Sequence, residues 1–227
     1  MTYQTHIVKN LDNFIVLVGR MKVKVIELFA GSCSFSNVAK EYGYETFTTD
    51  FEPFDGIDLV ADILDLEAKD FPFQPDIVWA SPPCTTFSIA SCGTHWFAPD
   101  ENGNRSPKTD ASKVGVQIVE KTRDLIKELN PTYFIIENPR GILRKLDLLS
   151  EFHRDQVSYC KYGDTRMKPT DLWHNLTGFE PRMCKNGMPC HESAPRGSRT
   201  GTQGIVGDFN RSKVPDQLCE EILALCK

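Results

Sequence analysis

Short runs of β-branched and aromatic residues alternate along the chain with segments whose apolar residues recur every three or four positions. The first pattern predicts buried strands and the second predicts amphipathic helices. We expect strands at residues 22–29, 44–49, 57–61, 76–80, 132–136, 155–162 and 171–173, and helices at 35–42, 113–129, 143–153 and 216–226. Repeated strand–helix–strand units predict an α/β fold with a doubly wound, mostly parallel, seven-stranded sheet.

The pattern also divides the chain into parts. They are a peripheral N-terminal extension (1–20), a main domain (21–175), a short irregular insert (176–206) and a C-terminal helical segment that packs back on the main domain (207–227). Within the main domain, residues 85–111 form a long polar connection. A loop of this length in a compact domain is typical of a lid over a functional site.

Composition narrows the class of protein. The chain has 227 residues, of which 40% are hydrophobic and 25% charged, as in ordinary globular proteins. No apolar run approaches the ~20 residues of a membrane helix, so we expect a cytoplasmic protein without membrane contact. Its eight cysteines are scattered through an α/β pattern, which favours reduced thiols.

Charge gives a mixed indication about nucleic acid. The net charge of −5 argues against a surface broadly adapted to phosphate. Basic residues nevertheless outnumber acidic ones between positions 182 and 211, where the chain has Arg182, Lys185, Arg196, Arg199 and Arg211. Such a segment supplies local positive charge that the net charge does not reveal.

Small and acidic residues gather where the first three strands end. Phe29-Ala-Gly31 closes the first strand, Asp50 ends the second about 20 residues further on, and Asp62 ends the third. Carboxylates in these places can accept hydrogen bonds from a ribose and from an exocyclic amine. The pattern predicts a nucleotide-type pocket, with ordinary loop carboxylates as the alternative.

A cysteine and a glutamate follow the next two strands. Ser81-Pro-Pro-Cys84 ends the fourth strand, because proline lacks the amide donor that a strand needs. Glu137 follows the fifth strand, which is expected beside the fourth. A thiolate nucleophile next to a carboxyl proton donor is one interpretation. A buried thiol at Cys84 and a turn cap at Glu137 are the other.

Further motifs fall in the same order along the chain. They are Glu27-Leu-Phe-Ala-Gly31, Asp50-Phe51, Asp62-Ile63, Ser81-Pro-Pro-Cys84 with Phe87-Ser88, Glu137-Asn138, Tyr162-Gly163 and Asn210-Arg-Ser-Lys-Val-Pro215. In order and spacing this set resembles the DNA (cytosine-5) methyltransferases, and it is most similar to the short, phage-type members. The resemblance covers residues 23 to about 225.

The resemblance implies that residues 21–175 are a Rossmann-like methyltransferase domain that binds S-adenosyl-L-methionine. The implied cofactor residues are Phe29, Ala30, Gly31, Asp50, Phe51, Asp62, Ile63 and Pro82. It also implies methyl transfer to C5 of a cytosine flipped out of double-stranded DNA. Cys84 would attack C6, and Glu137 would hold the base edge and supply a proton.

Other residues receive roles from the same resemblance. Arg166 or Lys168 would order the pocket around the base. The residues expected at the substrate or the DNA are Ser88, Asn138, Arg105, Lys108, Arg196 and Arg199. Arg105 and Lys108 belong to the predicted lid, which would close over the flipped base.

The chain also departs from the family pattern. Cys33 and Ser34 stand where two further glycines are usual, and Pro139 stands where the family has valine. The Gln-x-Arg-x-Arg run is replaced by Arg166, Lys168 and Thr170. The insert 176–206 is far shorter than the usual target-recognition domain, so the DNA is read by a short segment, by the lid or by a separate specificity partner. A restriction partner, host evasion and regulation are all open as biological roles.

Two other functions and one metal site are also considered. Ser-Pro-Pro-Cys resembles the Ser-Pro-Pro-aromatic loop of amino-group methyltransferases, although Cys84 and Glu137 argue against that chemistry. An inactive cofactor-binding protein on DNA would explain the altered motifs. Cys184, Cys190 and His191 are a weak zinc candidate, with Cys160 and His174 near in sequence. The spacing Cys-x5-Cys-His is not standard, so unliganded thiols and no metal are predicted.

Overall fold

The computed structural model describes residues 22–192 and 207–226. Its strands are β1 (Lys24–Leu28), β2 (Glu45–Asp50), β3 (Leu59–Val60), β4 (Ile77–Ala80), β5 (Tyr133–Pro139), β6 (His153–Ser158) and β7 (Pro169–His174). Its α-helices are α2 (Ser34–Glu41), α3 (Cys92–His95), α4 (Asp110–Leu129), α5 (Asp208–Ser212) and α6 (Asp216–Leu225). Short 3₁₀ turns are η1 (Ile63–Asp65), η2 (Ala68–Asp70), η3 (Thr85–Phe87), η4 (Leu143–Lys145), η5 (Asp147–Leu149) and η6 (Tyr159–Tyr162).

The strands form one seven-stranded sheet in the order β3-β2-β1-β4-β5-β7-β6. The pairs among β1 to β5 are parallel, while β7 runs antiparallel to both of its neighbours. The prediction of a doubly wound, mostly parallel sheet is confirmed. The chain leaves β1 toward one edge of the sheet and returns through β4 toward the other. The switch point therefore lies between the carboxyl ends of β1 and β4, which is where such sheets bind ligands.

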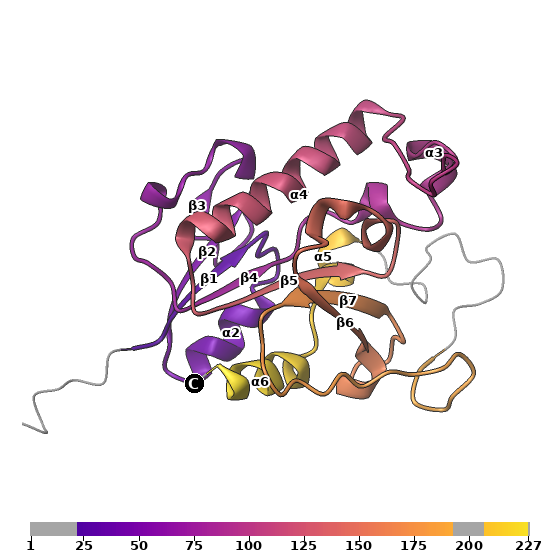
Figure 1. The fold of residues 1–227 in the computed structure, drawn as a ribbon. Helices are drawn as coiled ribbons and strands as arrows, with labels where there is room; N and C mark the ends of the chain where they lie inside the picture. Colours follow the sequence, from indigo (N-terminus) through magenta and orange to yellow (C-terminus); the bar gives the residue numbers. More distant parts are fainter. Residues whose placement is uncertain (1–21, 193–206, 227) are drawn as a thin grey trace, which may run out of the picture.

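Helices cover both faces of the sheet, as Figure 1 shows. Successive strand residues point to opposite faces. One core layer, under α4, contains Ile26, Val78, Ile136, Val119 and Leu125. The opposite layer, under α2 and α6, contains Val25, Trp79, Ile135, Phe35 and Leu218. Because both faces are covered, the central strands are apolar on both sides, as the sequence pattern predicted.

Three predicted elements differ from the structure. Residues 143–153 were expected to be one helix but form η4 and η5, because Leu146 between them has an extended backbone (φ −107°, ψ 149°). Leu143 and Leu149 are buried on either side of this break. The predicted strand 155–162 begins two residues earlier and stops at Ser158, where η6 starts. The lid 85–111 contains η3 and α3.

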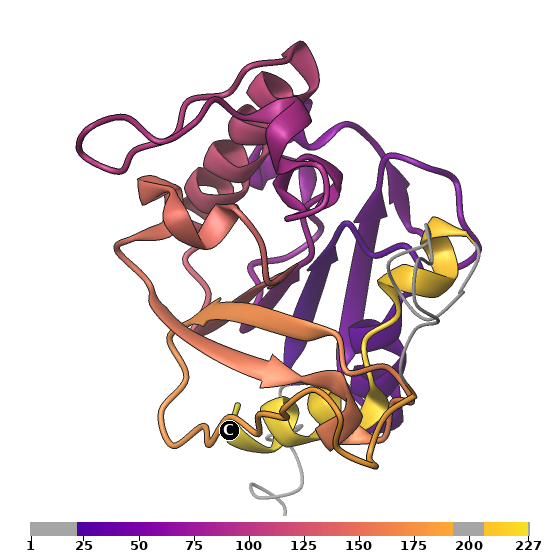
Figure 2. The ribbon, with the colours of Figure 1, turned by 90° about the vertical axis from the view of Figure 1, so that its right-hand side faces the viewer.

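The C-terminal part returns to the carboxyl edge of the sheet. Figures 1 and 2 show α5 near the ends of β1 and β2, with α6 beneath α2. The Val214 N–H donates to Ser34 Oγ at 3.2 Å, which joins this segment to the start of α2. Residues 207–226 therefore pack against the main domain. Within the described residues, no helix is long and apolar enough to cross a membrane.

Candidate active site

Cys84 lies in the loop after β4, immediately before η3, and its side chain is exposed. Phe87, three residues on, is buried, and its carbonyl accepts a hydrogen bond from the Ile142 N–H at 2.7 Å. A Cβ atom at Gly141 would lie 2.2 Å from that same carbonyl oxygen. The loop after β5 therefore holds the loop after β4 at a separation that only glycine permits at position 141.

Asn138 makes a second link between these two loops. Its side-chain amide donates to the Pro82 carbonyl at 2.9 Å, and the residue is fully buried. The sequence placed Asn138 at the substrate, but here it braces the Ser81-Pro-Pro-Cys84 turn from inside. The difference arises because Asn138 and Glu137 are successive strand residues and point to opposite faces of the sheet.

Glu137 is buried on the face of the sheet that carries α2 and α6, where it meets two side chains. Its Oε1 accepts a hydrogen bond from the Tyr159 hydroxyl at 2.8 Å and lies 3.7 Å from Lys168 Nζ. Burial, together with the Glu137 carboxylate, raises the pKa of Tyr159 well above its usual value. Tyr159 therefore stays protonated and keeps donating to Glu137. Lys168 Nζ also lies over the Tyr159 ring, 4.5 Å from its centroid.

The structure separates the two residues predicted to order the base pocket. Lys168 reaches Glu137, as just described. Arg166 is buried elsewhere: its guanidinium pairs with Asp164 and donates to the carbonyls of Arg211 and Lys213, each at 3.1 Å. Arg166 therefore fastens the residues after η6 to the loop after α5, and Lys168 is the better placed of the two to act on a base.

Residues predicted for the cofactor line the ends of β1, β2 and β3. Asp50 accepts hydrogen bonds from the Gly31 N–H and the Glu52 N–H, both at 2.9 Å. Phe29 and Gly31 have positive φ values of 58° and 48°, which turn the chain sharply after β1. Phe51 is 65% exposed directly after Asp50, and its aromatic ring is open to a planar ligand.

The third carboxylate in this row is Asp62, whose Oδ1 caps η1 by accepting the Leu64 N–H at 3.0 Å. Its other oxygen remains available to a ligand. Ile63 is buried beside it, and Pro82 is buried across the switch point. A tight turn, two carboxylates and an exposed aromatic ring fit an adenosine-type group, so these residues suit S-adenosylmethionine.

Glu27 is a site-supporting residue to which the sequence assigned no role. It is buried in β1, and its carboxylate accepts the N–H groups of Phe35 and Ser36 at 3.3 and 2.7 Å, at the start of α2. Burial raises the pKa of Glu27 to about 7, although these hydrogen bonds act in the opposite direction. The carboxylate replaces an N-cap side chain, because Cys33 at that position makes no such bond.

Cys33 shows how the altered glycine turn is accommodated. It adopts the left-handed conformation (φ 52°, ψ 35°) that glycine favours. Its buried thiol points toward the Gly56 carbonyl at 3.5 Å. The turn thus keeps its shape without the usual glycine at this position.

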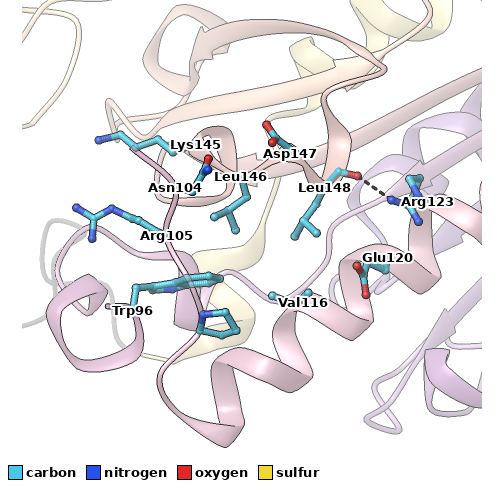
Figure 3. Close-up of a pocket in the computed structure, with 11 residues that line it drawn as sticks. Trp96, Asn104, Arg105, Val116, Glu120, Arg123, Lys145, Leu146, Asp147 and Leu148 are labelled. Atoms are coloured by element: carbon cyan, nitrogen blue, oxygen red, sulfur yellow. Dashed lines mark hydrogen bonds between the residues drawn. The ribbon is translucent and has the colours of Figure 1, made fainter. Parts of the chain in front are cut away.

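The lid lies beside two hollows of the surface. Figure 3 shows the first, whose apolar wall comes from Trp96 of the lid, Val116 of α4, and Leu146 and Leu148 of the η4–η5 segment. Trp96 is buried and donates through Nε1 to the Thr86 carbonyl at 2.7 Å, so the lid is tied to η3 next to Cys84. Lys108 is exposed on the lid, and Ser88 Oγ accepts the Ala90 N–H at 3.2 Å.

The second hollow is a basic groove lined by Ile89, Cys92, Arg105, Arg140, Gly141, Ile142, Arg144 and Lys145. Of its four cations, Arg144 is engaged with buried Asp171 at 3.0 Å, and Arg105 donates to the Phe97 carbonyl at 3.0 Å. Arg140 and Lys145 are exposed. Of these exposed or half-buried cations, Arg105 was predicted at the substrate or the DNA, and Arg140 and Lys145 were not, although both follow Glu137-Asn138 within eight positions.

The remaining predicted residues divide into two groups. Arg196 and Arg199 lie outside the described residues, as do residues 1–20 of the N-terminal extension. Cys184, Cys190 and His191 lie together with Cys160, with their ligand atoms all within 4.8 Å of one another. His174 is not part of this group; it belongs to a separate cluster with His153 and Asp155.

An open sheet of this order, with a tight turn after β1 and carboxylates after β2 and β3, defines the class of Rossmann-like S-adenosylmethionine-dependent methyltransferases. Comparisons with known proteins give the particular family. The family model for C-5 cytosine-specific DNA methylase matches residues 23–153. A protein of Frog virus 3 (isolate Goorha), named "Probable DNA (cytosine-5)-methyltransferase", is 30% identical over 223 residues, which are 90% of this chain and all of the viral protein.

Similar solved structures include a prophage-encoded protein of E. coli described as a DNA modification methyltransferase, with 17% identity and a TM-score of 0.49. That match covers 72% of this chain and 52% of the other. Another is the magnesium protoporphyrin IX methyltransferase of Synechocystis PCC 6803 with bound SAM, with 11% identity, a TM-score of 0.37, and coverage of 74% and 76%.

The chain belongs to the C-5 cytosine-specific DNA methylase family. It is a DNA (cytosine-5-)-methyltransferase that uses S-adenosyl-L-methionine. The resemblance and the activity expected from the sequence are confirmed.

Proposed function

We propose that Cys84 is the nucleophile of a covalent mechanism at cytosine. The observation that carries this proposal is the double brace on its loop: Asn138 holds Pro82 from β5, and Gly141 allows the Phe87 carbonyl to approach closely. An exposed thiol held on a braced loop at the switch point can meet a base brought from outside. A thiolate there would attack C6 of the cytosine, forming the S–C6 bond and making C5 electron-rich.

Glu137 is proposed to hold the N3 edge of the cytosine and to supply a proton as the thiolate adds. Its carboxyl is buried one strand away from the Cys84 loop, where an enclosed acid is effective. Tyr159 and Lys168 position the Oε1 oxygen of this carboxyl. Lys168 also provides a positive charge that balances the carboxylate when the proton has left.

S-adenosylmethionine, when bound, supplies an electrophilic methyl group. Asp50, Asp62 and Phe51 are proposed to hold it beside Gly31, so that C5 of the adduct faces the methyl group across the switch point. C5 would accept the methyl group, a base would remove the C5 proton, and the S–C6 bond would break as the N3 proton returns to Glu137, which restores the Cys84 thiolate and the aromatic ring. The products are 5-methylcytosine, S-adenosylhomocysteine and one proton.

We also propose that double-stranded DNA runs along the basic groove, where Arg140, Lys145 and Arg105 contact phosphates. Lys108 and Ser88 lie on the same lid, which is proposed to close over the flipped base. Since the recognition segment is short, a separate specificity partner is proposed to help select the target. All eight cysteines lack disulfides, which suits a reducing compartment such as the cytoplasm.

Methyl transfer by matched cysteine variants tests the nucleophile. Cys84→Ser should lose at least about 10³-fold in turnover on duplex DNA while its affinity for S-adenosylmethionine is unchanged. Cys226→Ala, at a buried cysteine that directly follows α6 and does not line the groove, is the control and should keep its activity. Mass spectrometry of digested product DNA should show 5-methylcytosine. A fully active Cys84→Ser enzyme would exclude the proposal.

Groove binding has its own test. Arg140→Ala should weaken DNA binding and lower the salt slope of the affinity by about one. Lys40→Ala, an exposed residue of α2 in the opposite layer, is the control. An unchanged salt slope for Arg140→Ala would place the DNA elsewhere.

A further inference from the structure

We propose that Cys160, Cys184, Cys190 and His191 form a structural zinc site that fastens residues 181–192 to η6. The proposed catalytic mechanism uses none of these four residues. Cys160 comes from η6, directly after β6, and the other three come from a segment that follows β7. Residues distant in sequence thus bring three sulfur atoms and one imidazole together.

Most of the measured distances between ligand atoms are close to those of a tetrahedral metal site, and the Cys184–Cys190 pair is shorter. Zinc–sulfur bonds of ~2.3 Å at tetrahedral angles put neighbouring sulfur atoms roughly 3.8 Å apart. Cys190 Sγ lies 3.7 Å from Cys160 Sγ and 3.2 Å from Cys184 Sγ. His191 Nδ1 lies 3.7 and 3.8 Å from the sulfur atoms of Cys184 and Cys190. Three thiolates and one imidazole are a ligand set that selects zinc.

The segment that supplies the ligands needs such a link. Within the described residues, 175–192 contain no helix or strand, and Met183 and Met188 are about half exposed, so little apolar surface is buried there. Hydrogen bonds tie the segment down at both ends: Ser158 N–H to the Arg182 carbonyl at 3.0 Å, and Glu192 N–H to the Thr165 carbonyl at 2.9 Å. A metal between these points would close the segment into a fixed loop.

The position of the loop links the proposed metal to the candidate active site. Thr165 directly precedes Arg166 and lies three residues before Lys168, which reaches Glu137. The zinc site would therefore hold residues 181–192 next to the residues proposed to receive the base. A metal here would replace the packing that a larger recognition domain obtains from its own core.

The other metal-like cluster is less suitable. Asp155 Oδ2 already bonds to the Nε2 atoms of His153 and His174, both at 3.2 Å. His174 Nδ1 in turn accepts the Leu176 N–H at 3.1 Å, so both of its ring nitrogens are engaged. The cysteine cluster, in contrast, offers three soft ligands at metal-binding distances.

Metal analysis of the purified full-length chain tests the proposal. The reduced wild type should contain about one zinc ion per chain. Cys190→Ser should lose most of this zinc, and Cys92→Ser should retain it. Cobalt reconstitution of the wild type should give the thiolate charge-transfer absorption and the d–d bands of a tetrahedral site. This measurement uses the wild type alone, so it does not depend on how well a variant folds.

Two results would overturn the zinc site. One is wild-type protein that, after expression with added zinc, contains no metal and shows no cobalt–thiolate absorption. The other is a Cys184–Cys190 disulfide in a peptide map of non-reduced protein. Neither measurement involves methyl transfer, so failure of this proposal is distinct from failure of the catalytic one.

Discussion

The two halves of the sheet's carboxyl edge are built in different ways. At the ends of β2 and β3, Asp50 and Asp62 are half-exposed carboxylates that bond to nearby backbone N–H groups. At the ends of β4 and β5, buried side chains connect distant parts of the chain, as in the Glu137–Tyr159 and Asn138–Pro82 hydrogen bonds. We call these the cofactor half and the base half.

The difference suggests a division of labour. The cofactor half presents carboxylates and the Phe51 ring at the surface, which suits a ligand that must enter and leave in every cycle. The base half fixes one acid and one thiol in a braced geometry, which suits a reaction that requires close positioning. Substitutions in the cofactor half should therefore change affinity for S-adenosylmethionine, and those in the base half should change turnover.

The largest effect on this comparison is expected from Glu137→Gln. The amide keeps the shape but cannot supply a proton, so turnover should fall by about 10²–10⁴-fold with little change in the Kd for S-adenosylmethionine. Single-turnover kinetics and calorimetry measure the two quantities, with exposed Glu128→Gln as the control. A weaker cofactor affinity with normal turnover would contradict the separate roles of the two halves.

A pH series of Glu27→Gln examines a buried carboxylate of β1, the strand between the two halves. Its pKa is raised from 4.5 to about 7 by burial, so the folded state holds the proton more tightly than the unfolded state. The stability that protonated Glu27 contributes is present below about pH 4.5 and is lost as the pH rises through about 7. Relative to Glu27→Gln, the wild type should lose up to roughly 3 kcal/mol in unfolding free energy over that window. Denaturant titrations of both proteins at several pH values would show this. A difference in unfolding free energy between them that does not change with pH would contradict it.

Gly141→Ala should disturb the base half through packing alone. The added methyl group would collide with the Phe87 carbonyl and push the Cys84 loop away, at a cost of about 1–3 kcal/mol in stability. Turnover should fall while cofactor affinity is kept. Gly93→Ala is the matched control, because a Cβ there meets nothing within 4 Å. Thermal unfolding and turnover are measured for both variants. Equal stability and equal turnover would contradict the proposal that Gly141 braces the Cys84 loop.

Asp50→Asn is the smallest change, and it tests the cofactor half. The variant loses the charge but keeps an acceptor for the Gly31 N–H. The Kd for S-adenosylmethionine should rise about tenfold, as expected for one weakened charge-assisted hydrogen bond. Turnover at saturating cofactor should be unchanged, and exposed Asp65→Asn should behave as wild type. A loss of turnover at saturation would show that Asp50 also acts on the chemistry.

The same contrast explains what could be predicted from the sequence. The strands, the switch point and Asp50 and Asp62 were predictable, because they depend on local periodicity and on residues at strand ends. Tyr159 was missed, and its segment was predicted as strand. Its role depends on a contact 22 positions away in sequence, which no local pattern encodes.

The cysteine cluster and the burial of Asn138 could not be predicted from the sequence, for related reasons. Cys160 becomes a neighbour of Cys184 only through the return of β7, and the spacing Cys-x5-Cys-His does not include it. The burial of Asn138 depends on which face of β5 it occupies, and the adjacent Glu137 occupies the other. Motif order identified the family, whereas side-chain direction required the structure.

Covalent trapping tests the central claim, the attack of Cys84 on cytosine C6, most directly. Mixed-sequence duplex DNA would carry 5-fluorocytosine, whose C5 bears fluorine in place of hydrogen. No proton can then be removed from C5, so the adduct cannot be released. With S-adenosylmethionine present, we expect a denaturation-resistant protein–DNA complex whose crosslinked peptide contains Cys84. Cys226→Ala should form it and Cys84→Ser should not. A crosslink at another residue, or no complex from enzyme that methylates ordinary DNA, would contradict the account.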